Sequence, residues 1–172
     1  MVLTVDLAER SYDVILQRGC LALAGELLNL NRKVLVVTDS GVPASYAQTV
    51  AKQAKESFVV TVPRGEENKN IHTWMTLLDR LVEENFTRSD CVVAVGGGVV
   101  GDMAGFAAAT YLRGIRFIQV PTTLLAAVDS SVGGKTAIDL PAGKNLVGAF
   151  WQPSLVLCDT DTLTSLPRDI FL

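Results

Sequence analysis

Short, almost wholly apolar runs of residues recur along the chain and are separated by longer amphipathic segments. Runs of this kind are typical of strands that are buried on both faces of a parallel sheet. Three of the runs are followed directly by proline or glycine, which is where a strand would end. The predicted strands are Lys33–Val37, Phe58–Val62, Cys91–Val95, Phe117–Val120 and Leu155–Leu157.

The segments between these runs carry apolar residues at helical spacing. In Ile71–Glu84, for example, Trp74 and Leu78 fall on the same helical face. Strands that alternate with helices predict an α/β fold, here a Rossmann-like parallel sheet flanked by helices on both faces. The other predicted helices are Leu21–Leu30, Gly98–Leu112 and a segment that Pro43 opens and that runs to about Lys55.

Two parts of the chain depart from this alternation. Val2–Leu7 and Tyr12–Gln17 alternate between apolar and polar residues, which predicts an N-terminal β-hairpin. Ala126–Gly148 is rich in glycine, serine and lysine and has little periodicity. Long irregular segments of compact domains are usually functional or mobile, so we expect a functional loop there.

Composition restricts the class of protein. The 172 residues are 49% hydrophobic and 19% charged, which is ordinary for one compact domain. The net charge of −3 and the lack of a basic run argue against a nucleic-acid partner. No apolar stretch has the length of a membrane span, and the first residues do not resemble a signal peptide, so we expect a cytoplasmic protein without a membrane partner.

Cysteine and histidine usage gives no metal site. Cys20, Cys91 and Cys158 lie far apart, and we expect them to be buried, reduced thiols. His72, the only histidine, falls in a predicted helix and is expected at the surface. No Cys/His pair has the spacing of metal ligands, so this chain alone predicts none.

A glycine turn after the strand Cys91–Val95 is the first candidate binding site. Gly96, Gly98 and Gly101 match G-x-G-x-x-G between a strand and a helix, the context of a dinucleotide site. The first N–H groups of that helix would face a pyrophosphate. A tight packing turn is the alternative interpretation, in which Asp102 would only offset the helix dipole.

The pattern is not a regular Rossmann fingerprint. That fingerprint has an acidic residue at the end of the next strand, where this chain has Val120, Pro121 and Thr122. Asp39, from an earlier strand, could hold a ribose instead. The segment SVGGKTA is not a P-loop, because Asp129 stands where that motif requires glycine.

Three lysines give a stronger indication of chemistry. Lys69, Lys135 and Lys144 each lie in a glycine-containing loop, where lysine supplies a point charge for phosphate or carboxylate. Asp129 and Asn145 lie beside two of them. Because ligands of open parallel sheets bind beyond the carboxyl ends of the strands, this set predicts a site for an anionic, hydroxylated small molecule.

Longer stretches resemble a known family. GGGVVGDMAGFAAATYLRGI, QVPTTLLAAVDSSVGGKTAID and GKNLVGAFWQP are similar to the 3-dehydroquinate synthase family, and PRGEENK resembles that family's P-x-G-E-x-x-K loop. The resemblance runs in order from about Asp39 to Pro167. It implies that residues 1–172 form a Rossmann-like, NAD-binding domain.

The resemblance also implies roles for particular residues. Asp129, Lys135 and Asn145 would contact the substrate, and Arg113 would reach the substrate phosphate of the neighbouring subunit in a homodimer. The implied cofactor contacts are Asp39, Glu66, Lys69, Gly97, Gly98, Val99, Asp102, Thr122, Thr123, Lys144, Thr162, Leu163, Thr164 and Ser165.

The family converts 3-deoxy-D-arabino-heptulosonate 7-phosphate to 3-dehydroquinate and phosphate in the shikimate pathway. The resemblance implies transient oxidation by NAD, loss of phosphate and an aldol ring closure, with zinc or cobalt polarising the oxidised oxygen. The family's metal ligands lie in a helical C-terminal domain, and this chain ends at Leu172 before reaching them. We therefore expect a fragment of a longer protein, without metal ligands and inactive alone.

Three alternatives to this function stay open. A related sugar phosphate cyclase of the 2-deoxy-scyllo-inosose synthase type would share the glycine turn and the GKN segment. A metal-dependent polyol dehydrogenase would share the architecture. A non-catalytic nucleotide-binding module would need only the glycine turn.

Overall fold

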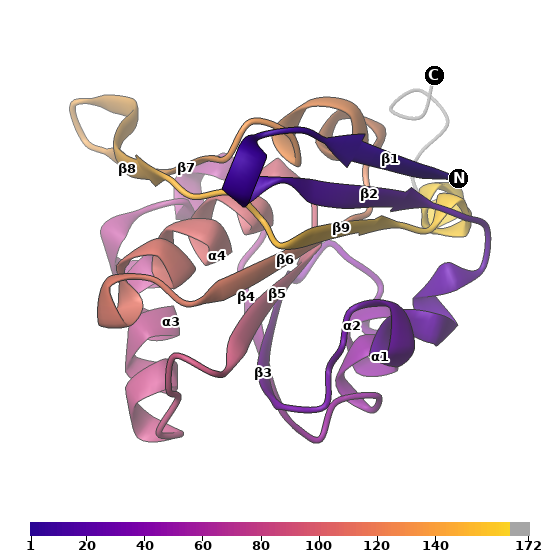
Figure 1. Cartoon of the computed structure of the whole chain (residues 1–172). Coiled ribbons are helices and arrows are strands. Elements are labelled where there is room, and N and C mark those ends of the chain that lie inside the picture. Colours follow the sequence, from indigo (N-terminus) through magenta and orange to yellow (C-terminus); the bar gives the residue numbers. More distant parts are fainter. Residues whose placement is uncertain (166–172) are drawn as a thin grey trace.

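The computed structural model describes residues 1–165, and a seven-stranded sheet forms its centre (Figure 1). The strand order is β1-β2-β9-β6-β5-β3-β4. The pair β1–β2 is antiparallel and every other neighbouring pair in this sheet is parallel, which confirms the predicted α/β fold with an N-terminal hairpin. The strands are β1 (Val2–Val5), β2 (Tyr12–Leu16), β3 (Lys33–Asp39), β4 (Glu56–Val62), β5 (Cys91–Gly96), β6 (Arg116–Pro121) and β9 (Leu155–Cys158).

Helices cover both faces of this sheet. Val34 and Val36 of β3 belong to one buried cluster, whereas Leu35 and Val37 belong to the other. Successive side chains of a strand point to opposite faces, so a strand covered on both sides must be apolar at every position. The helices are α1 (Ala24–Leu27) and α2 (Ala44–Ala51) on one face, and α3 (Ile71–Glu83) and α4 (Gly98–Thr110) on the other.

Helices α1, α2 and α4 end earlier than predicted. Helix α2 stops at Ala51 and not at about Lys55, and the backbone turns left-handed after the other two. Helix α1 spans only Ala24–Leu27, preceded by a 3₁₀ turn at Cys20–Leu23, and Asn29 beyond it has a φ of 51°. Helix α4 stops at Thr110 because Tyr111 is extended, with a ψ of 125°, and Leu112 after it has a left-handed φ of 51°. Leu166 and Pro167, whose sequence also resembles a helix start, lie outside the described residues.

The segment Ala126–Gly148 is not the irregular loop expected from the sequence. It contains a π-helical turn, η5 (Ala126–Ser130), and most of an antiparallel hairpin of β7 (Lys135–Leu140) and β8 (Gly143–Phe150). The expectation of an irregular loop was wrong, because a polar residue occupies a core position of β7 and so interrupts the hydrophobic pattern of a strand. Thr136 is buried against Gly105 of α4, and its hydroxyl donates a hydrogen bond to the Ala149 carbonyl at 2.8 Å.

The cysteines and the histidine lie as predicted. Cys20, Cys91 and Cys158 are free and buried, and His72 is exposed on α3. No helix within residues 1–165 combines the length and the apolar character that crossing a bilayer requires.

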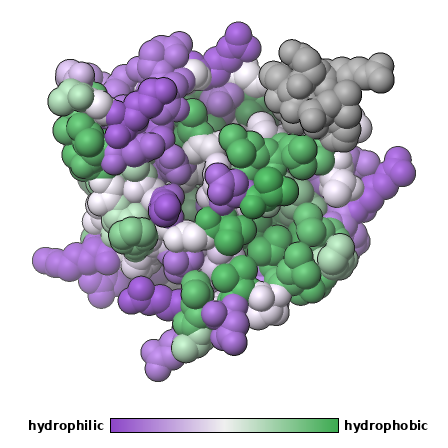
Figure 2. Space-filling view, turned by 90° about the horizontal axis from the view of Figure 1, so that it is seen from above, coloured by the Kyte–Doolittle hydropathy of each residue, from purple (hydrophilic) through white to green (hydrophobic). Residues whose placement is uncertain are grey.

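The face that carries η5 and β1 is notably apolar. Figure 2 looks down on this face and shows hydrophobic side chains gathered over its middle. Exposed apolar side chains of these segments include Val2 and Leu3 of β1, and Leu125 and Val128 at η5. Contiguous exposed apolar surface marks sites of contact, and this surface adjoins the carboxyl edge of the sheet.

Candidate active site

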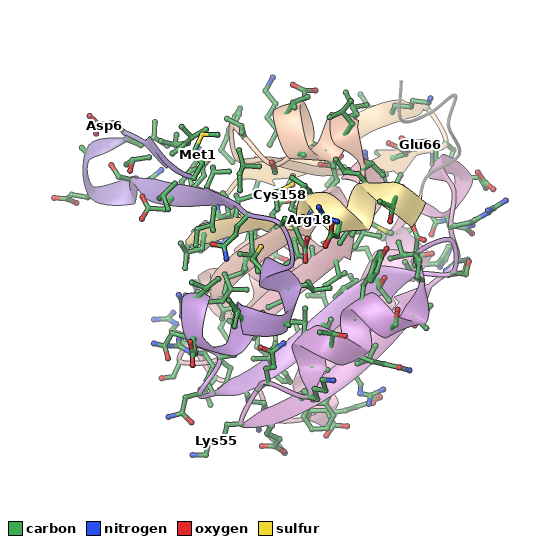
Figure 3. All side chains as sticks on the ribbon, turned by 90° about the vertical axis from the view of Figure 1, so that its right-hand side faces the viewer. Met1, Asp6, Arg18, Lys55, Glu66 and Cys158 are labelled. Carbon is green, nitrogen blue, oxygen red and sulfur yellow. The ribbon has the colours of Figure 1, made fainter. Side chains whose placement is uncertain are left out.

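Most of the predicted site residues lie at the carboxyl edge of the sheet, which is the edge where its parallel strands end. Strand β3 ends at Asp39, β5 leads into Gly97, and β6 leads into Thr122, whose N–H donates to the Gly96 carbonyl at 3.0 Å. Figure 3 shows Glu66 at this end of the molecule and Lys55 at the opposite end. Parallel strands therefore bring segments that are far apart in the sequence to one edge, as expected.

The glycine turn at this edge has two different roles. Gly96, Gly97 and Gly98 have no positive φ, so close packing and not backbone conformation accounts for them. A Cβ atom on Gly96 would lie 2.9 Å from the Val100 side chain, which supports the packing interpretation at that position. Gly97 and Gly98 are half-buried at the start of α4, which has no side-chain cap. The first N–H groups of α4 therefore fit an anion such as a pyrophosphate.

Lys69 is the centre of a polar network. Its side chain is 4% exposed, and its ammonium group donates hydrogen bonds to Asp102 Oδ2 and Asn145 Oδ1, both at 2.6 Å. Glu66 Oε1 lies 3.7 Å from the same nitrogen. A buried ammonium group is tolerated only when it is paired and hydrogen-bonded, which this one is. Lys69 thereby joins the loop after β4 to α4 and to β8.

Asp102 is held in a partly buried ion pair. Burial raises the pKa of Asp102 above its usual value, and the hydrogen bond from Lys69 acts in the opposite direction. Helix α4 begins at Gly98, so Asp102 lies beyond its first turn. The alternative in which Asp102 only offsets the helix dipole is therefore not supported.

Asn145 reaches Lys69 from an irregular point of the hairpin. The register of β7 and β8 shifts between Ile138 and Leu140, which leaves Asp139 opposite a bulge of β8. Asn145 lies in this bulge with a φ of 55°, a left-handed conformation that asparagine adopts more readily than most residues. Bulges of this kind re-aim a side chain, here the Asn145 amide.

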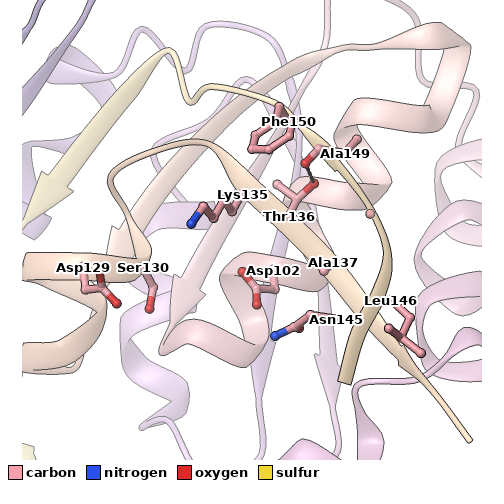
Figure 4. A pocket seen from close by; sticks show the side chains of 11 residues that line it. Asp102, Asp129, Ser130, Lys135, Thr136, Ala137, Asn145, Leu146, Ala149 and Phe150 are labelled. Carbon is pink, nitrogen blue, oxygen red and sulfur yellow. Dashed lines mark hydrogen bonds between the residues drawn. The ribbon is translucent and has the colours of Figure 1, made fainter. Parts of the chain in front are cut away.

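A cavity of ≈ 570 Å³ opens beside the Lys69 network (Figure 4). Asp129, Lys135 and Asn145, the three residues expected at the substrate, line it together with Asp102. A cation, two carboxylates and an amide around one hollow suit an anionic, hydroxylated molecule. Sequence reasoning missed further lining residues, namely Ser130, Thr136, Ala137, Leu146, Gly148, Ala149 and Phe150.

Other predicted site residues lie apart from this cavity. Arg113 is exposed beyond the far end of the 13-residue helix α4, which places it ~20 Å along the helix from Gly98. Lys144 lines a second hollow of ≈ 700 Å³ with Glu66 and Asp139.

The segment after β9 forms its own turn at the same edge. Residues Thr160–Ser165 form a 3₁₀ helix, η6, which contains the predicted cofactor contacts Thr162, Leu163, Thr164 and Ser165. Within it, the Thr162 hydroxyl donates to the Asp159 carbonyl at 2.8 Å. Figure 3 shows Arg18 beside this helix, where its guanidinium nitrogen lies 2.9 Å from Asp161 Oδ1.

The resemblance places the ligands of its divalent metal outside this chain. Within residues 1–165, no group of three or more histidine, cysteine, aspartate or glutamate side chains could hold a metal ion. No metal chemistry is therefore assigned to this chain.

Known proteins are similar to this chain in sequence. The sequence profile of a family described as 3-dehydroquinate synthase N-terminal matches residues 59–172. The 3-dehydroquinate synthase of Pelobacter propionicus is 52% identical over 177 residues, covering 99% of this chain and 49% of that protein. The chain thus spans about half the length of the curated relatives that it matches.

Solved structures of cofactor complexes share the fold. The crystal structure of 2-deoxy-scyllo-inosose synthase complexed with carbaglucose-6-phosphate, NAD⁺ and Co²⁺ has a TM-score of 0.90 and 34% identity, covering 99% of this chain and 48% of that one. ValA (2-epi-5-epi-valiolone synthase) from Streptomyces hygroscopicus, with NAD⁺ and Zn²⁺ bound, has a TM-score of 0.85 and 30% identity, covering 96% and 48%.

Proposed function

This chain belongs to the 3-dehydroquinate synthase family, and on that premise we propose that residues 1–172 are the NAD-binding half of such an enzyme. The proposed reaction converts 3-deoxy-D-arabino-heptulosonate 7-phosphate to 3-dehydroquinate and phosphate in the shikimate pathway. One observation carries the proposal: Asp102 and Asn145, which accept hydrogen bonds from Lys69, line the same cavity as Asp129 and Lys135. Gly98, at the uncapped start of α4, packs against Ser130 of the same lining. Because the chain spans about half of its relatives, the reaction is proposed for the longer protein.

The cofactor would lie along the carboxyl edge of the sheet. NAD, when bound, supplies a hydride acceptor that the catalytic cycle regenerates. The N–H groups of Gly98 and Val99 would hold its pyrophosphate, since Gly97 and Gly98 leave the backbone accessible. Asp39 would accept hydrogen bonds from a ribose. The remaining proposed contacts are Glu66, Lys69, Asp102, Thr122, Thr123, Lys144 and Thr162–Ser165.

The substrate would occupy the cavity beside the cofactor. Lys69 already donates to Asp102 and Asn145, so its charge is largely neutralised. Lys135 is exposed at the cavity and is the cation available for a substrate oxyanion. Asp129 and Asn145 would hold substrate hydroxyl groups.

Arg113 does not line the cavity of its own chain and follows the carboxyl end of α4. We therefore propose that it reaches the substrate phosphate of a neighbouring subunit in a homodimer. We also propose a cytoplasmic location, because the three buried cysteines are free, as they are in reducing compartments.

A calorimetric titration of NAD into the purified chain tests the cofactor site. We expect binding by the wild type and none by Gly98→Val, whose side chain would cover the amide groups of α4. A side chain at Gly98 also meets Ser130, since a Cβ atom there would lie 3.0 Å from the Ser130 hydroxyl oxygen. The matched control is therefore Ser130→Gly, alone and combined with Gly98→Val.

Ser130→Gly alone should bind NAD, and the double variant should not. Binding by the double variant would show that Gly98→Val acts through the Ser130 clash. A wild-type chain that is folded by circular dichroism but does not bind NAD would overturn the proposed cofactor site. In a separate assay with zinc and substrate, phosphate release by this chain alone would overturn the assignment of half an enzyme.

The likeness to 2-deoxy-scyllo-inosose synthase supports a second candidate function, cyclisation of glucose 6-phosphate. Incubating the full-length protein with each of the two sugar phosphates separates the candidates. Turnover of glucose 6-phosphate alone would favour the second. Net accumulation of NADH would instead indicate a dehydrogenase, because a cyclase returns the hydride.

A further inference from the structure

We propose that Asp139 is a positioning residue that holds Asn145 and Lys69 in their binding arrangement. This inference rests on the proposed function, because Lys69 and Glu66 are proposed cofactor contacts and Asn145 is a proposed substrate contact. Asp139 itself lies on β7, opposite the bulge of β8, and it does not line the ≈ 570 Å³ cavity.

Three hydrogen bonds close a ring through Asp139. Its N–H donates to the Lys69 carbonyl at 2.8 Å, and its Oδ1 accepts from the Asn145 N–H, also at 2.8 Å. The Asn145 side chain then accepts from the Lys69 ammonium group at 2.6 Å. Both site residues are therefore anchored to Asp139, Lys69 through the Asp139 N–H and Asn145 through the Asp139 carboxylate. The side chains of Lys69 and Asn145 then meet each other.

The conformation of Asn145 makes this anchor necessary. Its φ of 55° is left-handed and costs free energy for any residue except glycine. The hydrogen bond from its N–H to Asp139 occurs only in this bulged conformation and offsets that cost. Without an acceptor at position 139, the bulge can relax and withdraw the Asn145 amide from Lys69.

Asp139 and Glu66 line the same ≈ 700 Å³ hollow, so their carboxyl groups influence each other's ionisation. Two carboxyl groups can hydrogen-bond to each other only when one of them is protonated. Burial raises the pKa of Glu66, and the hydrogen bond to Asp139 raises it further. Although burial acts to raise the pKa of Asp139, the Asn145 N–H and the Glu66 hydrogen bond lower it below its usual value. Of the two carboxyl groups, Glu66 is therefore the one that keeps its proton to higher pH.

The charged groups that face this pair come from three elements. Lys69 follows the turn that contains Glu66, Lys144 projects from β8, and Asp102 faces Asp139 from α4. The two lysines favour ionised carboxylates, and Asp102 opposes ionisation of Asp139. Raising the pH removes the proton from Glu66 and leaves two carboxylates in contact, so the Glu66–Asp139 hydrogen bond breaks.

Two variants of Asp139 separate positioning from simple loss of charge. Asp139→Asn keeps an oxygen that accepts from the Asn145 N–H and adds an amide that can donate to ionised Glu66. Asp139→Ala removes both hydrogen bonds. We expect Asp139→Ala to weaken NAD binding about tenfold and Asp139→Asn to stay within about threefold of the wild type.

The pH profile of NAD affinity is the readout that a purely structural role would not move. In the wild type the affinity should change as Glu66 loses its proton. In Asp139→Asn this change should move to lower pH, because a neutral donor replaces the carboxylate that raises the pKa of Glu66. Unaltered affinity in Asp139→Ala, or no rescue by a folded Asp139→Asn, would overturn the proposal.

Hydrogen–deuterium exchange of the ligand-free chain tests the anchor without NAD. The Asn145 amide should exchange about tenfold faster in Asp139→Ala and at the wild-type rate in Asp139→Asn. Equal exchange in wild type and Asp139→Ala would overturn the anchor, whether or not NAD binds. Failure of the wild type to bind NAD, with the expected exchange pattern, would overturn the proposed function while the Asp139 anchor stands.

Discussion

The ammonium group of Lys69 lies 2.6 Å from the carboxylate of Asp102, although 33 positions separate the two residues in the sequence. One side chain comes from the loop after β4 and the other from the second turn of α4. Lys69 is almost wholly buried, so neither solvent nor salt screens its end of the pair strongly. The pair ties the predicted cofactor loop to the predicted cofactor helix.

Breaking this pair should destabilise the fold. Lys69→Met keeps the apolar stem but leaves Asp102 partly buried and unpaired, and we expect a loss of about 2 kcal/mol in the free energy of unfolding. The loss should shrink as the pH is lowered, because protonated Asp102 needs no cation. Urea unfolding at two pH values measures both effects.

Asp102→Asn added to Lys69→Met is the matched control. It removes the unpaired charge, so the double variant should be more stable than Lys69→Met alone at neutral pH. A double variant that is less stable than Lys69→Met would contradict this account of the pair.

Asp159 should stabilise the contact between the amino-terminal segment and η6. It is buried, and its carboxylate accepts hydrogen bonds from the N–H groups of Gly19, Leu21 and Asp161 at 2.8–2.9 Å. Asp159→Ala would leave three donors without this acceptor, at a cost of about 3 kcal/mol in the free energy of unfolding. Asp159→Asn, which keeps the shape and one oxygen, should cost less. Equal stability of Asp159→Ala and wild type in thermal unfolding would show that water replaces the carboxylate.

Gly114 should tolerate no side chain. Its φ of 123° disfavours other residues, and the Trp151 ring occupies the place of a Cβ atom. We expect Gly114→Ala to cost about 3 kcal/mol in the free energy of unfolding, through strain and displacement of the ring. Gly19→Ala is the control, because Gly19 also has a positive φ, of 75°, but open space around it. It should cost only about 1 kcal/mol. Similar losses in both variants would mean that Trp151 moves freely.

The buried thiols should make the fold sensitive to alkaline pH. Burial raises the pKa of Cys20 and of Cys91 to about 11 each, against roughly 8.5 in an unfolded chain. Between these values the folded state binds more protons than the unfolded state. Their contribution to stability is thus fully present below about pH 8.5 and is lost as the pH rises through about 11.

Thiol reactivity checks the burial that underlies this prediction. A colorimetric thiol reagent at about pH 8 should react slowly with the folded chain and at once with the urea-unfolded chain. Rapid reaction of all three cysteines in the folded chain would contradict their burial.

The alternation of strands and helices could be predicted because it depends on local composition. A strand covered on both faces must be apolar throughout, and β3, β5 and β6 lie where such runs occur. The location of the site could be predicted from topology, since the carboxyl ends of parallel strands lie together at one edge of the sheet. Lys135 and Asp129 could be selected by residue type, and they do line one cavity.

The details of the site depended on contacts between distant residues. The hydrophobic pattern did not predict strand β7, because the polar residue Thr136 occupies one of its buried positions. The Thr136 hydroxyl is satisfied there by a hydrogen bond to a carbonyl of the neighbouring strand. The bulge opposite Asp139 depends on the pairing register of β7 and β8, which no local propensity specifies. The sequence alone therefore determined the sheet, its helices and the chemical character of its edge. Only the tertiary structure decided which partner each buried charge has, because Lys69, Asp102 and Asn145 meet through three separate elements.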